Sequence, residues 1–217
     1  MFLGHFGVAF AAKKAAPAIS LGMLFVAAQF ADLLWPLLVL AGIERVEVRP
    51  GITAVTPLDF IHYPYSHSLV ALIGWGVALG FGYRIVRGGG WRAAAVIAAL
   101  VVSHWFLDVA VHRPDVPVGL DESTKLGLGI WNSIPASLAV ELVLFGACVA
   151  LYAQATRAVD RIGTWAFRGL IAFFLVIYAR SVFGPPPPSA QAVAWSGVGM
   201  WLLVAWAHWI DKHRLAA

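Results

Sequence analysis

The sequence predicts an all-α integral membrane protein with about six transmembrane helices and a short N-terminal helix that is re-entrant or interfacial. Three observations support this fold class. Hydrophobic residues make up 61% of the 217 positions. Charged residues make up only 12%, whereas soluble domains carry roughly 25%. The apolar residues form long runs without a visible repeat, so we expect one integral membrane domain over residues 1–217.

The apolar runs define the expected elements in chain order. Residues 2–12 are too few to cross a bilayer, which takes about 20 residues, and Lys13 and Lys14 would hold the end of this helix at an interface. Pro17 lies just before the first span and Gly184 just after the fifth. Neither residue type favours a helix interior, so these two residues mark the ends of spans. We expect spans over residues 18–43, 67–83, 91–112, 134–155, 162–183 and 190–210.

The distribution of Lys and Arg predicts the topology, because these residues are enriched on the cytoplasmic side of membrane proteins. With both termini in the cytoplasm, ten of the fifteen Lys and Arg residues lie on that side. The other five are Arg45, Arg49, Arg113, Lys125 and Arg180. We therefore expect cytoplasmic termini. The net charge of +4 follows from this bias, and we expect no nucleic acid partner.

Three of the eleven acidic residues, Asp32, Asp108 and Glu141, lie within the apolar spans. Acidic residues inside a membrane are costly and are candidates for function. Counting helical rise from the nearest cytoplasmic charge places these three acids and His67 at one level, roughly 24–27 Å deep. Side chains of the types that bind metal ions would thus come together from four helices, towards the outer leaflet.

His104 and Asp108 are four residues apart, so they stack on one helix face with Cβ atoms ~6 Å apart. Both side chains can reach one divalent cation, although a hydrogen bond between them would explain a single pair equally well. The shared depth of the four helices favours a metal site. Carboxylate and imidazole donors without a thiolate suit Zn²⁺, Mn²⁺ or Fe²⁺, and the number of candidate ligands allows one or two ions.

The chain resembles the inner-membrane metal-dependent hydrolases, also described as LexA-binding, inner-membrane-associated hydrolases. The matching pieces are Gly4-His5-Phe6-Gly7, Asp32, residues 62–68, Ser103-His104 and Leu107-Asp108. The resemblance implies an inner-membrane location and a metal-site core over residues 1–145, with accessory spans at 162–210. The order of ligand types is also similar to zinc-dependent phospholipase C, although no second His-x-x-x-Glu pair follows.

We therefore expect a membrane-embedded metal-dependent hydrolase that acts on a phosphoester or lipid-linked ester through a metal-activated water. Asp32, His67, His104 and Asp108 would hold the metal, for which zinc is the first expectation. Glu141 would complete a second ion, and Glu141 or Asp32 would act as the catalytic base. Family order adds His5 as a ligand, whereas its distance from Lys13 places it too shallow.

We expect His62, Ser66 and Ser103 to contact the metal ligands and hold them in position. Ser66 is also a plausible N-cap for the second span. Two other functions remain open. One is a divalent-cation or proton-coupled transporter, although transport sites tend to lie near the midplane between repeats. The other is a membrane protein with a structural metal site.

Overall fold

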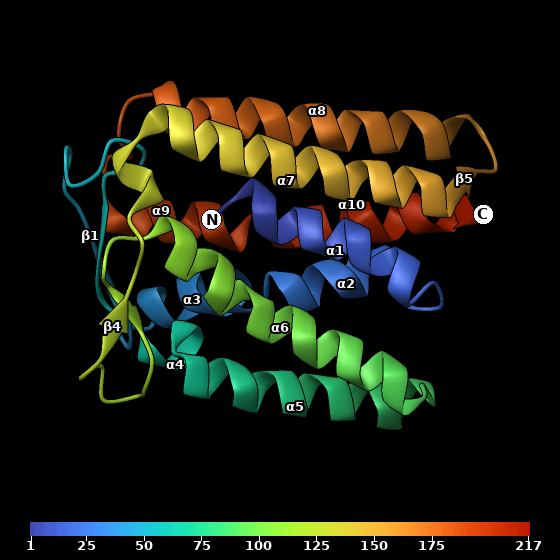
Figure 1. Ribbon diagram of the computed structural model, residues 1–217, viewed down its shortest axis with the longest axis horizontal. Coiled ribbons are helices and arrows are strands. Elements are labelled where there is room, and N and C mark those ends of the chain that lie inside the picture. The colour runs from blue at the N-terminus through green and yellow to red at the C-terminus, as the bar shows by residue number, and fades with distance from the viewer.

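The computed structural model describes residues 1–217 as an elongated bundle of helices with three small two-stranded sheets (Figure 1). The predicted all-α membrane fold is confirmed. The long helices are α5 (Leu69–Arg87), α6 (Trp91–Val111), α7 (Ile134–Ala155) and α8 (Arg161–Phe183). The shorter ones are α1 (Leu3–Ala15), α2 (Leu21–Ala28), α3 (Phe30–Leu40), α4 (Pro64–His67), α9 (Ala190–Val198) and α10 (Trp201–Lys212), with a 3-10 helix, η1, at Ile130–Asn132.

Five helices are long and apolar enough to cross a membrane, namely α5, α6, α7, α8 and the run Ala190–Lys212 formed by α9 and α10. The bent pair α2 and α3 makes a sixth candidate. Large apolar side chains are exposed on the outer faces of these helices, including Val77, Phe106, Val143, Val176 and Leu202. Such a belt of exposed apolar groups fits contact with lipid chains.

The first span differs from the single helix expected over residues 18–43. It is bent by 59° between α2 and α3, with the break at Gln29. Each half packs on its own partner, because α2 lies against α10 and α3 lies against α9. Glycines allow both approaches: Cβ atoms built at Gly22 and Gly197 would lie 2.8 Å from His208 and 2.9 Å from Pro36. The bend therefore lets this span follow the two-piece α9–α10 run.

Helix α1 is buried inside the bundle, where it packs against α7, α2 and α6 (Figure 1). It is therefore not interfacial. Phe6 and Phe10 are almost fully buried and join an aromatic core with Phe25, Phe145 and Phe174. A helix that buries apolar residues all round belongs in a core. This half-length helix carries its N-terminal turn to the middle of the molecule.

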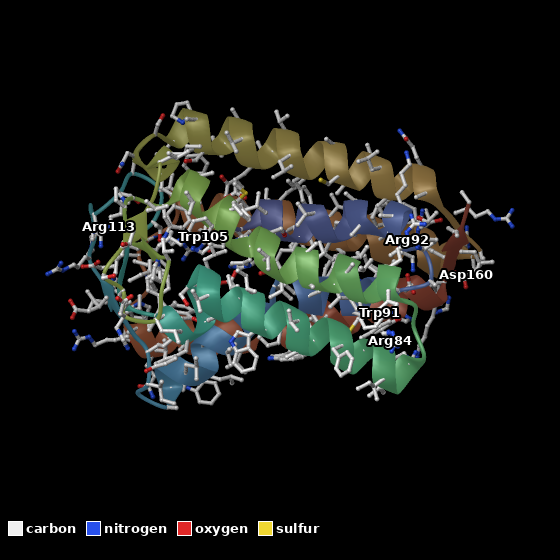
Figure 2. The ribbon with its side chains drawn as sticks, turned by 60° about the horizontal axis from the view of Figure 1, so that its bottom comes forward. Arg84, Trp91, Arg92, Trp105, Arg113 and Asp160 are labelled. Atoms are coloured by element: carbon white, nitrogen blue, oxygen red, sulfur yellow. The ribbon has the colours of Figure 1, made fainter.

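The two ends of the bundle carry different charged residues and different strands. One end carries Arg84, Arg92 and Asp160, and Arg113 lies at the other (Figure 2). The first end also carries the pair β5 (Thr156–Ala158) and β6 (Arg214–Ala216). The second carries the hairpin of β1 (Arg45–Val48) with β2 (Leu58–His62) and the pair β3 (Val116–Pro117) with β4 (Lys125–Leu126).

Met1 departs from the expectation that both termini lie at the Arg84 end. It is buried, and its nitrogen contacts the Asp108 carboxylate. The reason is the position of α1, which starts inside the bundle and runs towards the end where the C-terminus lies (Figure 1).

Close packing of α5 on α6 gives a test of the bundle. A Cβ atom at Gly80 would lie 2.5 Å from the Ala94 carbonyl oxygen, whereas a Cβ atom at Gly82 would meet nothing within 4 Å. Gly80→Ala should lower the thermal unfolding temperature in detergent, because overpacking costs about 1–3 kcal/mol. Gly82→Ala is the matched control and should not lower it, because alanine favours a helix over glycine by about 1 kcal/mol. Equal effects would contradict this packing.

Candidate metal centre

Five side chains from four helices converge near the end of the bundle that carries the β1–β2 hairpin. They form two overlapping groups, His5 with His104 and Asp108, and Asp32 with His67 and His104. Within each group the candidate ligand atoms lie within 4.8 Å of one another. The donors come from α1, α3, α4 and α6. This His/Asp cluster could hold a metal ion.

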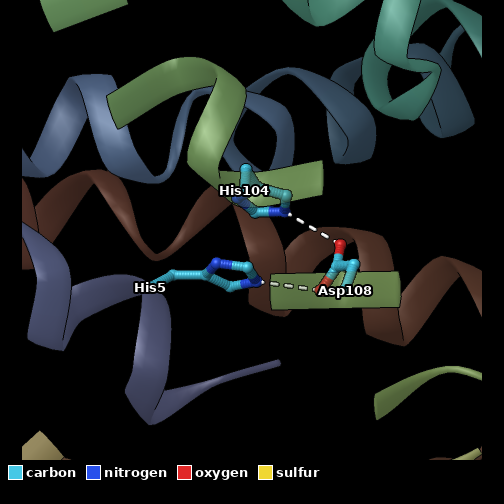
Figure 3. A group of neighbouring side chains, drawn as sticks. All are labelled: His5, His104 and Asp108. Atoms are coloured by element: carbon cyan, nitrogen blue, oxygen red, sulfur yellow. Dashed lines mark hydrogen bonds and ion pairs between the residues drawn. The ribbon is translucent and has the colours of Figure 1, made fainter. Parts of the chain in front are cut away.

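Asp108 is the centre of the cluster, and its two oxygens face different partners. Its Oδ2 lies 3.2 Å from His104 Nε2 and 3.9 Å from His67 Nε2. Its Oδ1 lies 3.0 Å from His5 Nε2. Figure 3 shows the rings of His5 and His104 side by side, both directed at this carboxylate. The two rings are stacked, with centroids 3.6 Å apart.

His104 presents Nε2 to the cluster because its other nitrogen is already used. Nδ1 lies 2.9 Å from the Ala28 carbonyl oxygen, which can only accept, so Nδ1 carries the proton. Nε2 is buried without a hydrogen-bond partner, and it faces Asp32 Oδ2 at 3.8 Å as well as Asp108. A nitrogen lone pair facing two carboxylates is favourable only when a cation or a proton lies between them. The residues present therefore fit a metal ion.

His67 is oriented by a relay that begins at Glu44. The Ser66 hydroxyl donates to Glu44 Oε2 at 2.6 Å and therefore accepts from His67 Nδ1, 2.7 Å away. The backbone N–H groups of Tyr65 and Ser66 donate to Glu44 Oε1. His67 Nε2 is thus free to bind metal, and it lies 3.4 Å from Asp32 Oδ1. Partners of this kind fix the orientation and basicity of metal-binding histidines.

Ser66 therefore supports His67 instead of capping the second span. Ser68 is the N-cap of α5, because its side chain accepts from the Ala71 N–H. The role of Glu44 was missed at the sequence level, where it was placed in a polar connection. Its burial, with 2% of its surface exposed, is visible only in the folded chain.

His5 belongs to the cluster, so the depth comparison with Lys13 was misleading. Lys13 is itself buried, and its Nζ donates to the Ile19 carbonyl at 2.8 Å and to Asp211 Oδ1 at 2.6 Å. It therefore does not mark the membrane surface from which depth was counted. The structure brings His5 to Asp108, next to which the family order had placed it.

Glu141 lies on the wall of the adjoining cavity but outside both ligand groups. Its two oxygens accept from the backbone N–H groups of Phe2 and Gly4, each at 3.0 Å. An acid at the N-terminus of a helix satisfies free N–H groups and the helix dipole. The geometry gives Glu141 the task of anchoring α1, which differs from the predicted ligand and base.

The other two predicted supporting residues do not contact the ligands. His62, on β2, forms an ion pair with Glu122. The Ser103 hydroxyl donates to the Leu100 carbonyl of its own helix at 2.7 Å. Both side chains therefore have partners outside the cluster.

A cavity of about 760 Å³ adjoins the cluster, within the size range of about 300–1,000 Å³ typical of ligand sites. Asp32, His67 and Asp108 contribute to its wall. Most of the remaining wall is apolar. Its residues include Trp35 of α3, Phe60 of β2, Trp131 of η1, Tyr178 of α8, and Leu203 and Trp206 of α10. The candidate metal centre thus faces an apolar chamber.

Comparison with family models, with curated proteins and with solved structures finds no match to this chain. The fold and cluster together define a class: a helical membrane protein with a buried His/Asp site that could hold a metal ion.

The serine relay gives a test of the site. Ser66→Ala removes the acceptor of the His67 Nδ1 proton and should weaken zinc binding by about 10–100-fold, as loss of such supporting partners does. Ser103→Ala is the matched control, because its hydroxyl bonds only to Leu100, and it should bind zinc like the wild type. Competition titration against a chelating dye measures both affinities. Equal affinities for the two variants would count against His67 as a ligand.

Proposed function

We propose that this protein is a membrane-embedded metal-dependent hydrolase that cleaves a phosphoester or a lipid-linked ester. The observation that supports the proposal is the position of the His/Asp cluster, which lies on the wall of an otherwise apolar cavity. A polar reactive site and an apolar binding chamber share one space. This arrangement suits a substrate with a polar ester and a hydrocarbon chain.

In this proposal Asp32, His67, His104 and Asp108 hold a divalent metal. Imidazole and carboxylate donors favour Zn²⁺, and Mn²⁺ or Fe²⁺ are alternatives. A bound metal of this kind lowers the pKa of a coordinated water and polarises an ester oxygen. The protein orients the donors, because Ala28 and Ser66 hydrogen-bond to the Nδ1 atoms of His104 and His67.

Asp32 can hold the metal through one oxygen and accept a proton through the other, so it is the strongest candidate for a proton acceptor. Its side chain is 27% exposed, compared with 3% for Asp108, and it lines the cavity. A carboxylate within reach of both the metal ligands and the substrate space can accept a proton as water attacks. Glu141 is not assigned this role, because backbone N–H groups of α1 occupy both of its oxygens.

The cavity wall favours a lipid substrate. Trp35, Trp131 and Trp206 lie on this wall, and so do Phe60 and Leu203. Burial of a hydrocarbon chain against such groups is favourable by about 25 cal/mol per Å² of apolar surface. The chain would occupy the apolar part of the cavity while the ester reaches Asp32 and Asp108.

We place the protein in a bacterial-type inner membrane, with the Arg84 end cytoplasmic and the metal centre towards the outer leaflet. The support is the excess of Lys and Arg assigned to the cytoplasmic side. Reporter fusions in the Gly88 turn should then be cytoplasmic, and fusions in the loop at Pro185 should be extracytoplasmic. Fusions that report the same side for both loops would contradict this topology.

Asp108→Asn tests the hydrolase proposal directly. Purified wild-type protein should release product from at least one member of a panel of phospholipids and prenyl phosphate esters in the presence of Zn²⁺. Asp108→Asn should reduce the rate to background, because it removes the carboxylate that faces His5, His67 and His104. Asp121→Asn, in an exposed loop, is the control and should retain the wild-type rate.

The same variants separate the hydrolase from a transporter. In sealed vesicles a hydrolase should yield product without a metal flux that depends on Asp108. Metal flux that Asp108→Asn abolishes, together with no product across the panel, would overturn the proposed function.

A further inference from the structure

We propose that Arg180 and the cavity around it bind the phosphate group of a lipid. This second cavity adjoins the apolar cavity of the metal centre, so one lipid would place its hydrocarbon chain in the apolar cavity and its phosphate beside Arg180. The inference rests on the proposed function in one respect, because it takes this lipid as the substrate. The binding itself is tested apart from hydrolysis.

The second cavity has a volume of about 540 Å³, which is within the range of about 300–1,000 Å³ typical of ligand sites. It lies between the β1–β2 connection, the C-terminal end of α8 and α9. Several residues line both cavities, among them Val55, Ile177 and Ser181. The two cavities therefore adjoin along a shared wall.

The charges on the two walls differ in sign. Arg180 is the one charged residue that lines the second cavity, and no acid lines it. The wall of the apolar cavity carries the acids Asp32, Asp108 and Glu141 instead. The acids of the first cavity favour a cation, whereas the second cavity favours an anion.

Arg180 has no carboxylate partner. Of the basic residues near this end of the bundle, Arg49, Arg113 and Lys125 pair with carboxylates, whereas Arg180 pairs with none. Its side chain is exposed. A guanidinium presents its N–H groups as a planar fork that matches two oxygens of a phosphate. Arg180 is thus free to bind an oxyanion in the second cavity.

The end of α8 positions the Arg180 side chain. The Gly184 N–H donates to the Arg180 carbonyl oxygen at 2.9 Å. A Cβ atom at Gly184 would overlap the guanidinium, so the missing side chain lets Arg180 fold over the end of the helix. The prolines at 185–187 line the same cavity, and proline restricts the backbone. The guanidinium therefore lies beside a stiff segment of chain.

Thr56 offers a second donor on the wall that the two cavities share. Its Oγ1 accepts from the Leu58 N–H at 3.3 Å, and its own proton is not donated to any group of the chain. The hydroxyls of Ser181 and Ser196, on the same wall, donate to carbonyls of their own helices at 2.8 and 2.9 Å. The Thr56 hydroxyl can therefore donate to a phosphate oxygen.

This site would narrow the substrate class. Arg180 does not line the cavity that contains Asp32 and Asp108, so a phosphate bound to Arg180 is separate from the ester that reaches the metal centre. The substrate would then carry a phosphate in addition to the bond that is cleaved. Among lipids, a glycerophospholipid has this combination of groups.

Lipid binding tests the site. The full chain, purified in detergent and kept in a chelator to prevent metal-dependent hydrolysis, is titrated with dioleoyl phosphatidic acid and with dioleoylglycerol. Native mass spectrometry measures the bound lipid. The wild type should prefer phosphatidic acid, and Arg180→Ala should weaken its binding about 10–100-fold, as loss of a hydrogen bond to a charged group does. Arg180→Lys keeps the charge without the fork and should give an intermediate affinity.

Arg45→Ala is the matched control. Arg45 is an exposed arginine on β1 that also lacks a carboxylate partner, and it lines neither cavity. This variant should bind phosphatidic acid like the wild type. Equal affinities for Arg45→Ala and Arg180→Ala, or a wild type that binds both lipids equally, would overturn the site. Displacement of the lipid by inorganic phosphate in the same concentration range would overturn the lipid as its ligand.

Thermal unfolding of each variant shows whether it is folded, and Thr56→Val, which should also weaken phosphatidic acid binding, keeps the test valid if Arg180→Ala is not. The proposed function fails separately. Binding that depends on Arg180 without hydrolysis of any lipid in Zn²⁺ would support the site and remove the hydrolase. Lipid hydrolysis with a KM that Arg180→Ala leaves unchanged would do the reverse.

Discussion

The buried carboxylate of Asp108 is the constraint on which the rest of the site depends. An uncompensated charge inside a membrane protein costs several kcal/mol, and Asp32 adds a second one nearby. Compensation comes from the amino group of Met1, which forms an ion pair with Asp108, and from the surrounding imidazoles together with any cation or proton that they share. Four helices must therefore meet at one point, and their packing can be understood from that need.

The irregular elements of the fold are the ones that build this point. Helix α1 begins in the middle of the bundle, where it delivers His5, and Glu141 anchors its first turn through Phe2 and Gly4. The bend between α2 and α3 places Ala28 behind His104 and Asp32 beside it. The straight helices α5, α7 and α8 supply the scaffold and the lipid-facing surface.

The spans could be predicted from the sequence because apolar length alone identifies them, and helical rise brought Asp32, His67 and Asp108 to one level. Three features could not be predicted. The rise along a helix predicts the depth of a residue in the membrane but not the direction of its side chain. Glu141 therefore lies at the expected level, but its side chain points to α1 and not to the cluster. Depth counted from Lys13 was misleading for His5, because Lys13 is buried and pairs with Asp211. Glu44 reaches Ser66, and through it His67, from 22 residues away, and no local pattern encodes such a contact.

X-ray absorption at the zinc edge of the purified protein tests the central claim most directly. A centre built from these residues should give a shell of nitrogen and oxygen at ~2.0–2.2 Å without sulfur, together with outer scattering from several imidazole rings. A shell containing sulfur at ~2.3 Å, or a folded protein that retains no zinc, would contradict a His/Asp metal centre at Asp108.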